Sequence, residues 1–485
     1  MKRASICFAL CTALLCGCSG GGGGTTTSPV PAWGKFRHDL NNTGQGPADL
    51  AGSRGFVGAV TIDALPPPSS TPPATPATGS AIVASPAIAL DGTVYIASSG
   101  GTLAAVNPSD LTVKWRRTSC EICAAPTPQA TPGTALADAQ ELGPLLSSPA
   151  VYSVNGVTSV MIGSSAHRDA TGTLRSGGFF VFEDTGNGQP TCAVCFRPNV
   201  LDPLAAPASF LGSPTFTINL ANFNGLFRPI DGIFFGSDAG VFYVIGPDGS
   251  LKWRFPRSGT IGAITSSPAF GQGNTVYFTA ADNLLYALVT TDGALKWTFP
   301  VAAPMSAPFG TTPLASLVTY AAADDGSIVA INPDGTFAFS TAPRPGDEIL
   351  GALALGSLQE LTPTPASGPT PTPLTNPELA VAVTRSGSVI AIPAAAPTPT
   401  VFPPATPIPA PVLSSPAVSV DLFVVFGAND GKLYGINMGT GEAPSAEWPV
   451  QLMSPPVPIR SSPAIADDGT VFIGADDGKL YVVRP

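Results

Sequence analysis

The chain has 485 residues and a net charge of −10, and only 11% of its residues are charged. Phosphate binding needs concentrated Lys and Arg, and the sequence contains no basic cluster, so its composition argues against a nucleic-acid partner. Hydrophobic residues make up 44% of the chain, which is enough for a substantial core.

The first residues are predicted to be a lipoprotein signal peptide. Lys2 and Arg3 precede an apolar stretch, residues 4–15, that is too short to span a bilayer and is typical of an export signal. The stretch ends at Leu15-Cys16-Gly17-Cys18, which resembles a bacterial lipobox. The resemblance implies that residues 1–17 are removed and that Cys18 carries the lipid. An ordinary secretory signal, cut nearby, is the alternative.

Residues 18–32 then form a Gly- and Thr-rich tether. Ser19 follows the lipidated position, where an Asp would suggest inner-membrane retention in a Gram-negative cell, so the outer membrane is favoured. No later segment is apolar enough, over a sufficient length, to be a transmembrane helix. We expect an exported protein that is lipid-anchored to the bacterial cell envelope and not threaded through a membrane.

A four-residue phrase close to Ser-Ser-Pro-Ala recurs along the chain. Its copies begin at Ala84, Ser147, Gly212, Ser266, Thr311, Ser414 and Ser461, with a weaker copy at Gly351. Repetition at a spacing of about 40–65 residues marks a radial or stacked architecture. One large closed array is therefore expected, and not a row of separate domains.

Each repeat is predicted to contain four strands, a to d. In the fourth repeat they span residues 265–270, 275–279, 284–288 and 294–299, where β-branched and aromatic residues dominate. Asp-Gly pairs between strands b and c are typical of two-residue hairpins, as in Asp325-Gly326, Asp430-Gly431 and Asp477-Gly478. No window has sustained helical periodicity. The prediction is an all-β fold, an eight-bladed β-propeller of four-stranded antiparallel blades.

Pro recurs in strand a and Trp in strand d. Pro cannot donate to a strand ladder, so strand a is expected at the inner edge of each blade, where it lines a central channel. Strand d is then the outer edge. Its tryptophans are expected to pack between neighbouring blades, and they are Trp115, Trp253, Trp297 and Trp448.

The last repeat ends at Pro485 after its third strand, so its fourth strand must come from elsewhere. The segment Phe56–Ile62 precedes the first strand a and has no a, b or c strand of its own. We expect it to complete the last blade, which would close the ring and remove an open sheet edge.

Four tracts rich in Pro, Thr and Ala interrupt the repeats, at residues 66–76, 126–132, 361–377 and 397–411. They are predicted to be extended, polyproline-like loops. Most fall between strand d of one blade and strand a of the next, whereas residues 361–377 join strands a and b of the sixth blade. They are interpreted as passive surface loops, and docking of a partner on them is the alternative.

The repeats resemble those of the quinoprotein-dehydrogenase-like, or PQQ-like repeat, eight-bladed propellers. The motifs are Ser-Ser-Pro-Ala, Asp91-Gly-Thr-Val-Tyr-Ile96, Asp430-Gly-Lys-Leu-Tyr-Gly-Ile-Asn437, Asp248-Gly-Ser-Leu-Lys-Trp253 and the lead-in Trp33-Gly-Lys-Phe-Arg-His-Asp39 with Asn42-Thr-Gly44. The resemblance covers residues 33–485 and implies a propeller with Pro-rich loop insertions. In anchor, blade number and repeat type, the chain is also similar to the propeller lipoproteins of the outer-membrane β-barrel assembly machinery.

The chain departs from the quinone-dependent dehydrogenases of that family. Those enzymes use a vicinal Cys-Cys disulfide, a Trp platform and carboxylates around calcium. This sequence has no Cys-Cys pair, and its tryptophans fall mostly in strand d. No cofactor is therefore expected.

Besides Cys18, the mature chain has two Cys-x-x-Cys pairs, Cys120/Cys123 and Cys192/Cys195. Both lie near the ends of strand d in consecutive blades, so the four are expected to be neighbours. Export favours disulfides, either within each pair or between the pairs. A four-cysteine zinc site is the alternative. A redox centre is disfavoured because no helix N-terminus is expected there, and covalent haem is excluded because neither pair precedes His.

The two histidines, His38 and His167, have no visible Ser, Asp or Glu partner, so no catalytic triad is predicted. His38 is interpreted as a structural contact, and His167 is placed in an irregular connection, residues 166–177. The Asp-rich turns lack the spacing of a calcium loop and are interpreted as turn formers, and they are Asp324-Asp325, Asp467-Asp468 and Asp476-Asp477.

These observations lead to the hypothesis of a non-catalytic propeller that is monomeric by itself and binds another envelope protein or peptide as a scaffold. No catalytic, cofactor or metal residue is assigned. The alternative is a quinone-dependent oxidoreductase of the same fold, and the second alternative is a binding protein stabilised by a four-cysteine zinc site. The partner, the biological process and the binding face stay open.

Overall fold

The computed structural model describes most of the chain from residue 50 onward. The described residues are 50, 55–63, 80–123, 141–168, 172, 174–198, 207–218, 230–271, 273–301, 318–323, 325–357, 378–393, 398–402, 404, 407–419, 422–438 and 448–484. The predicted signal peptide, Cys18, the tether and His38 lie outside the described residues. What was predicted for them stays a prediction.

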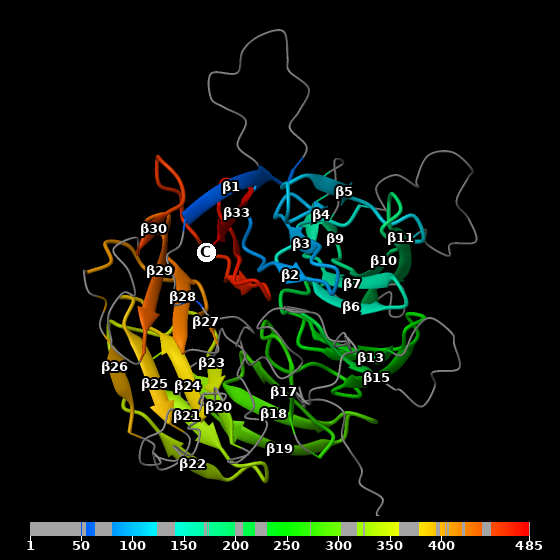
Figure 1. Cartoon of the computed structure of the whole chain (residues 1–485). Coiled ribbons are helices and arrows are strands. Elements are labelled where there is room, and N and C mark those ends of the chain that lie inside the picture. The colour runs from blue at the N-terminus through cyan, green and yellow to red at the C-terminus, as the bar shows by residue number, and fades with distance from the viewer. Residues whose placement is uncertain are drawn as a thin grey trace, which may run out of the picture.

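The chain winds into a ring of eight antiparallel blades, and in Figure 1 the colours run round this ring from blue to red. Blades 1 and 2 comprise β2 (Ala87–Ile88), β3 (Val94–Ala97), β4 (Leu103–Val106) and β5 (Val113–Arg117), then β6 (Ala150–Val154), β7 (Val157–Gly163), β10 (Phe179–Asp184) and β11 (Thr191–Phe196). Blades 3 and 4 comprise β12 (Thr215–Ile218), β13 (Ile230–Gly236), β14 (Phe242–Ile245) and β15 (Leu251–Phe255), then β16 (Ala269–Gly271), β17 (Thr275–Ala280), β18 (Leu284–Val289) and β19 (Leu295–Pro300).

The second half of the ring follows the same order. Blades 5 and 6 comprise β20 (Thr319–Ala322), β21 (Ile328–Ile331) and β22 (Phe337–Ser340), then β23 (Ala354–Ser357), β24 (Glu378–Val383), β25 (Val389–Pro393) and β26 (Thr400–Phe402). Blades 7 and 8 comprise β27 (Ala417–Val418), β28 (Phe423–Gly427), β29 (Lys432–Asn437) and β30 (Val450–Gln451), then β31 (Ala464–Ile465), β32 (Val471–Gly474), β33 (Lys479–Arg484) and β1 (Gly55–Thr61). The phrase that opens blade 5, residues 311–314, lies outside the described residues. The predicted all-β, eight-bladed propeller is confirmed.

The N-terminal strand closes the ring, as predicted. β1 pairs antiparallel with β33, with Gly58 opposite Val482 and Val60 opposite Leu480, and Figure 1 shows blue β1 beside red β33. The backbone N–H of Ile62 extends the contact by donating to the carbonyl of Gly478 at 3.0 Å. The last blade therefore has its outer strand, and its sheet edge is covered.

The repeated phrase holds the inner ends of the blades together. In six of the eight phrases the second residue donates its backbone N–H to the hydroxyl of the same position in the next blade, for example Ser85 to Ser148 at 2.8 Å and Ser148 to Ser213 at 3.0 Å. The same contact recurs from Ser213 to Ser267, Ala352 to Ser415, Ser415 to Ser462 and Ser462 to Ser85. A buried Ser at this position is therefore an acceptor that satisfies a backbone donor on the preceding blade.

Strand a is shorter than predicted. In the fourth blade it begins at Ala269, directly after the Pro of the phrase, and not at residue 265. Pro has no N–H to pair, and the preceding Ser266 uses its hydroxyl to accept the N–H of Thr279 at 3.0 Å. The phrase is thus bonded through Ser side chains, and regular strand pairing starts only after it.

The Asp-Gly turns between strands b and c are three-residue loops, so the prediction of two-residue hairpins was wrong. In blade 5, Gly326 donates to the carbonyl of Ala323 at 2.9 Å, and Ala323 donates to the carbonyl of Ser327 at 2.9 Å. The loop ends at Gly326, whose φ is 78°. Only the glycine needs a positive φ, so Asp325 keeps a right-handed conformation and its Oδ1 accepts the N–H of Ser327 at 2.9 Å.

One Pro-rich tract contains a strand that the sequence interpretation missed. Within residues 397–411, β26 pairs with β25 as the outer strand of blade 6. An outer strand is paired on one side only, so neighbouring prolines do not exclude it. The placement of residues 361–377 between strands a and b is confirmed, because β23 and β24 pair directly.

The tryptophans assigned to strand d pack between neighbouring blades, as predicted, and three of the four also donate a hydrogen bond to the next blade. Trp115 donates to Oδ2 of Asp184 at 2.8 Å, and Trp253 and Trp297 donate to the carbonyls of Thr290 and Pro333 at 3.1 and 2.9 Å. Trp448 lies just before β30, where its ring centroid is 5.3 Å from that of Phe423 in its own blade, and it belongs to the buried cluster that blade 7 shares with blade 8.

The core is divided among the seams between blades. Seven clusters of buried hydrophobic residues are formed by the described residues, and each joins strands of neighbouring blades. The cluster at the closing seam includes Ile62 from the N-terminal segment and Val482 from β33, both fully buried. Among the described residues, no helix has the length and hydrophobicity needed to cross a membrane.

Candidate functional site

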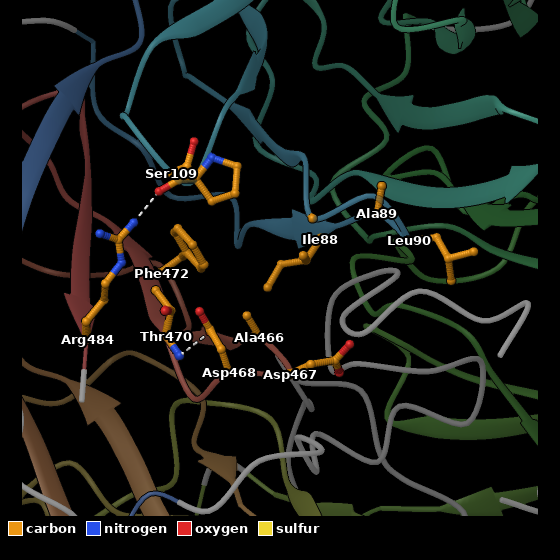
Figure 2. Close-up of a pocket in the computed structure, with 12 residues that line it drawn as sticks. Ile88, Ala89, Leu90, Ser109, Ala466, Asp467, Asp468, Thr470, Phe472 and Arg484 are labelled. Atoms are coloured by element: carbon orange, nitrogen blue, oxygen red, sulfur yellow. Dashed lines mark hydrogen bonds between the residues drawn. The ribbon is translucent and has the colours of Figure 1, made fainter. Parts of the chain in front are cut away.

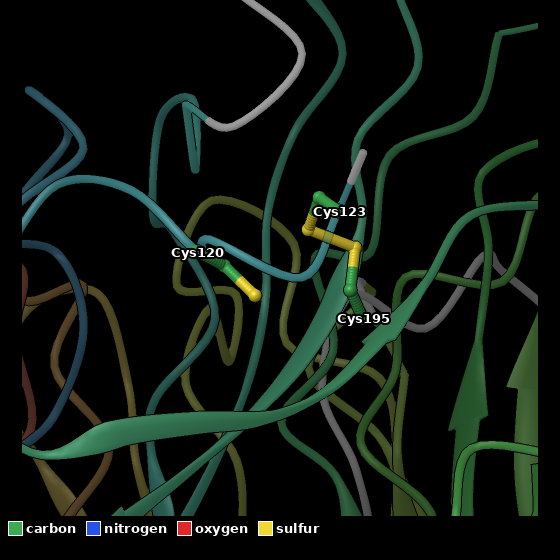
Figure 3. A group of neighbouring side chains, drawn as sticks. All are labelled: Cys120, Cys123 and Cys195. Atoms are coloured by element: carbon green, nitrogen blue, oxygen red, sulfur yellow. A yellow bond between two sulfur atoms is a disulfide. The ribbon is translucent and has the colours of Figure 1, made fainter. Parts of the chain in front are cut away.

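The four cysteines form two disulfides between the Cys-x-x-Cys pairs. Cys120 bonds to Cys192 and Cys123 to Cys195, each with a Cα–Cα distance of 5.4 Å, and Figure 3 shows the second bond beside Cys120. Cys120 and Cys123 follow β5 of blade 1, whereas Cys192 and Cys195 lie in β11 of blade 2. The two bonds therefore join the outer strand of blade 2 to the segment that follows the outer strand of blade 1. Of the two pairings left open by the sequence, this is the one between the pairs.

The zinc alternative depends on the same sulfur atoms. Those of Cys120, Cys123 and Cys195 lie within 4.8 Å of one another. Zinc needs thiolates, and a sulfur in a disulfide is not one. A metal site at this position would therefore require reduced cysteines.

Aromatic rings and guanidinium groups surround the disulfides. Phe180 and Phe182 of β10 share a buried cluster with Cys120 and Cys192. The guanidinium carbons of Arg117 and Arg197 lie 5.8 and 5.6 Å from the centroids of Phe182 and Phe180. Burial lowers the pKa of Arg197, and the nearby positive charge of Arg175 lowers it further. The arrangement is that of a packed seam in which cations cover aromatic faces.

His167 has a neighbouring carboxylate that the sequence did not reveal. It lies in a short hairpin, β8 (His167–Arg168) with β9 (Leu174–Arg175), and not in an irregular connection. Its Nε2 is 4.0 Å from Oε2 of Glu141, which comes from the preceding connection. Both ring nitrogens are buried without a hydrogen-bond partner, and the Cα of Gly143 packs against the ring. The contact joins blades 1 and 2, and no hydroxyl nucleophile completes a triad among these residues.

The aspartates predicted to form turns do so. Asp325, Asp468 and Asp477 each accept the backbone N–H two residues on, at 2.9, 2.9 and 3.2 Å. Asp324 lies outside the described residues. Asp476 forms an ion pair with Arg460 at 2.9 Å. Asp467 has a different position, because it lines a hollow in the surface.

This hollow, of about 480 Å³, lies at the closing seam between blades 8 and 1. Its floor includes the buried side chains of Ile88 and Phe472, and Leu90, which is 41% exposed, forms part of its wall. Figure 2 shows Arg484 extending toward Ser109 of blade 1, while Asp467 and Asp468 lie in the turn before β32. The side chain of Arg484 donates to the carbonyl of Pro108. The hollow thus has an apolar floor with positive and negative groups at different ends, which suits binding, and it was not foreseen from the sequence.

Residues 230–396 match the family described as outer membrane protein assembly factor BamB. No curated protein matches the chain. The crystal structure of BamB from Moraxella catarrhalis is similar at a TM-score of 0.53 and 13% identity, over 89% of this chain and 100% of that chain. Quinohemoprotein alcohol dehydrogenase from Comamonas testosteroni gives a TM-score of 0.55 at 12% identity, over 95% of this chain and 81% of that one.

A computationally designed protein, Ika8, has a TM-score of 0.52 at 14% identity, over 84% of this chain and 96% of its own. At such low identities these similarities show the fold alone, and one fold hosts many activities. The match to the family runs from β13 to β25, that is, from blade 3 to blade 6.

Proposed function

Because this chain is a propeller of PQQ-like repeats that is similar to BamB, we propose that it is a non-catalytic, protein-binding propeller of the cell envelope. Its anchor is the lipid on Cys18, and its partner is another envelope protein or a segment of one. The family that residues 230–396 match is described as an outer membrane protein assembly factor, and this description supports a partner from the same process.

One observation carries the proposal. The residue types that the quinone enzymes use around their cofactor serve here in contacts between blades. The four cysteines bond blade 1 to blade 2, and Trp115, Trp253 and Trp297 donate to the blade that follows. A ring locked in this way presents rigid faces on which a partner can dock without ordering either surface.

The test is crosslinking in native membranes followed by mass spectrometry of the purified adducts. We expect adducts with envelope proteins, and we expect them to be reduced when Cys18→Ala prevents lipidation. If the soluble Cys18→Ala protein formed the same adducts, the result would support partner binding and would contradict the role of the lipid anchor. A protein that forms no specific adduct would overturn the proposal.

The second candidate is a quinone-dependent oxidoreductase, favoured by the similarity to quinohemoprotein alcohol dehydrogenase. Purified protein is mixed with quinone and calcium and assayed for dye reduction with alcohols and sugars. Reduction at a rate above that of free quinone would establish the enzyme and displace the scaffold function.

A further inference from the structure

Strand d carries a bulge at the same place in most blades, and the residue in the bulge is often Lys. In blade 1 the pairing of β4 with β5 skips Lys114, and in blades 3 and 4 the corresponding pairings skip Lys252 and Lys296. At a bulge, the extra residue does not follow the regular alternation of side chains between the two faces of the sheet. The bulge therefore gives the lysines of blades 1, 3 and 4 a common direction, whereas alanines, Ala193 and Ala338, stand in the bulges of blades 2 and 5.

These lysines reach back over the blade to strand b and the turn before it. Nζ of Lys114 lies 2.5 Å from Oγ1 of Thr93 and 3.7 Å from Oδ2 of Asp91. Nζ of Lys296 lies 2.5 Å from Oγ1 of Thr275, and Nζ of Lys252 lies 2.7 Å from Oδ1 of Asp231. An ammonium group thus satisfies a hydroxyl or a carboxylate at the beginning of strand b.

Blade 8 has the same acceptors but no lysine. Its turn Asp468-Gly469-Thr470 repeats Asp91-Gly92-Thr93, and both Asp side chains accept the N–H of their Thr, at 2.9 and 3.0 Å. The pairing of β1 with β33 skips Val57, so a valine stands in the bulge where blade 1 has Lys114. Gly58 likewise stands where blade 1 has Trp115.

The loss of the lysine leaves a polar group without a partner. Thr470 is only 2% exposed, and its Oγ1 is buried and accepts or donates no hydrogen bond. Among the described residues, no cation forms an ion pair with Asp467 or Asp468. All three residues line the hollow at the closing seam. A buried, unsatisfied hydroxyl normally has a ligand or a water as its partner.

We propose that this hollow receives the side chain of a lysine from a partner protein, with the ammonium group between Thr470 and the two aspartates. The proposal rests on the proposed function, and it names the chemistry of the partner segment. The apolar floor of Ile88 and Phe472 suits the methylene chain of lysine. Arg484 lines the other end of the hollow and has further N–H groups beside the one that it donates to Pro108, and these are donors for the backbone carbonyls of the partner segment.

The experiment measures binding of small probes to the purified full-length protein by calorimetry. The probes are n-hexylammonium, its neutral analogue n-hexanol, and the peptide acetyl-Leu-Lys-Leu-amide. We expect n-hexylammonium to bind in the range of about 1 mM, n-hexanol about tenfold more weakly, and the peptide more tightly than n-hexylammonium.

Two variants separate the site from the fold. Val57→Lys supplies the missing ammonium from the chain itself, so it should raise the melting temperature and weaken n-hexylammonium binding about tenfold. Asp468→Asn should weaken binding to a similar degree. Asp334→Asn, in a turn whose Asp makes the same hydrogen bond to Thr336, should leave binding unchanged.

Equal binding of n-hexylammonium and n-hexanol would overturn the proposal, as would unchanged n-hexylammonium binding by Val57→Lys. Spermidine binding more tightly than the peptide would assign the hollow to free polyamines and overturn the partner lysine. If these binding assays fail but crosslinking in membranes succeeds, the lysine site is overturned and the proposed function is not. If the probes bind as expected but no adduct forms in native membranes, the result counts against the proposed function.

Discussion

The backbone N–H of Ser462 donates to the hydroxyl of Ser85 at 3.1 Å, across 377 residues of chain. The same bond joins other pairs of consecutive blades, and this one joins the last blade to the first. The closing seam is thus held at its inner end by the repeated phrase and at its outer end by β1.

Ser85→Ala should lower the free energy of unfolding by about 1–3 kcal/mol, because it leaves the buried N–H of Ser462 without an acceptor. Denaturation by urea measures the change. Ser258→Ala, at an exposed position, is the control and should change the value by less than about 0.5 kcal/mol. Equal changes in unfolding free energy for the two variants would mean that the hydroxyl of Ser85 does not contribute to stability.

Ile62→Ala should cost about 2–5 kcal/mol of unfolding free energy, because Ile62 is fully buried in the cluster of the closing seam. Val401→Ala, on the outer strand of blade 6 where Val401 is 39% exposed, serves as the control and should cost about 0.5 kcal/mol or less. A similar, small loss for both variants would contradict the role of the N-terminal segment in closing the ring.

Replacement of Cys120 and Cys192 by Ser should lower the unfolding free energy by about 2–4 kcal/mol, since the bond closes a loop with a sequence separation of 72 residues. Peptide mapping without reduction should find Cys120 linked to Cys192 and Cys123 linked to Cys195. Linkage within either Cys-x-x-Cys pair, or four free thiols with bound zinc, would contradict this pairing.

Gly335→Ala should destabilise the protein more than Gly346→Ala. Both glycines have a positive φ, 85° and 82°, so the backbone strain added by a Cβ is similar. At Gly335 the Cβ would lie 2.6 Å from Cγ of Trp297, whereas at Gly346 no atom lies within 4 Å. We expect an additional loss of about 1–3 kcal/mol at Gly335. Equal melting temperatures of the two variants would contradict the prediction, because they would mean that the Trp297 ring moves away from the added Cβ without loss of stability.

Asp63 should make stability fall in acid. Burial alone would raise the pKa of its carboxyl, but hydrogen bonds from Ser98, Thr102 and Ser80 outweigh burial and hold the pKa below the ordinary value of 3.8. The contribution is therefore present above the unfolded pKa and is lost as the pH falls through the lowered, folded value. Urea unfolding between pH 5 and pH 2 should show a smaller acid loss for Asp63→Asn than for the unchanged protein. Parallel curves would contradict the prediction.

The fold could be predicted from sequence because the repeat supplies the same signals eight times. The Pro in seven of the eight phrases marks an edge strand, and the incomplete last repeat requires a donor such as Phe56–Ile62. β26 was hidden because an edge strand tolerates the prolines around it. The three-residue turns were missed because Asp-Gly fits both kinds of loop, and only hydrogen bonds distinguish them.

The candidate site was less predictable. The cysteine pairing depends on how β11 lies against the segment after β5, and spacing alone allows both connectivities. The hollow at the seam depends on which residue fills each bulge. That Val57 takes the place of a lysine is visible only once β1 and β33 are in register.

The pairing of β1 with β33 also determines when the ring can close during synthesis of the chain. β1 is among the first described residues to be synthesised, and its partner strand is among the last. Until β33 has been synthesised, β1 lacks the strand with which it pairs. A chain that is cut short before β33 therefore leaves β1 unpaired and the sheet of the last blade open. Neither β1 nor the edge of the last blade can be covered until both strands have been synthesised. Fragments that lack either strand are therefore expected to be prone to aggregation and proteolysis.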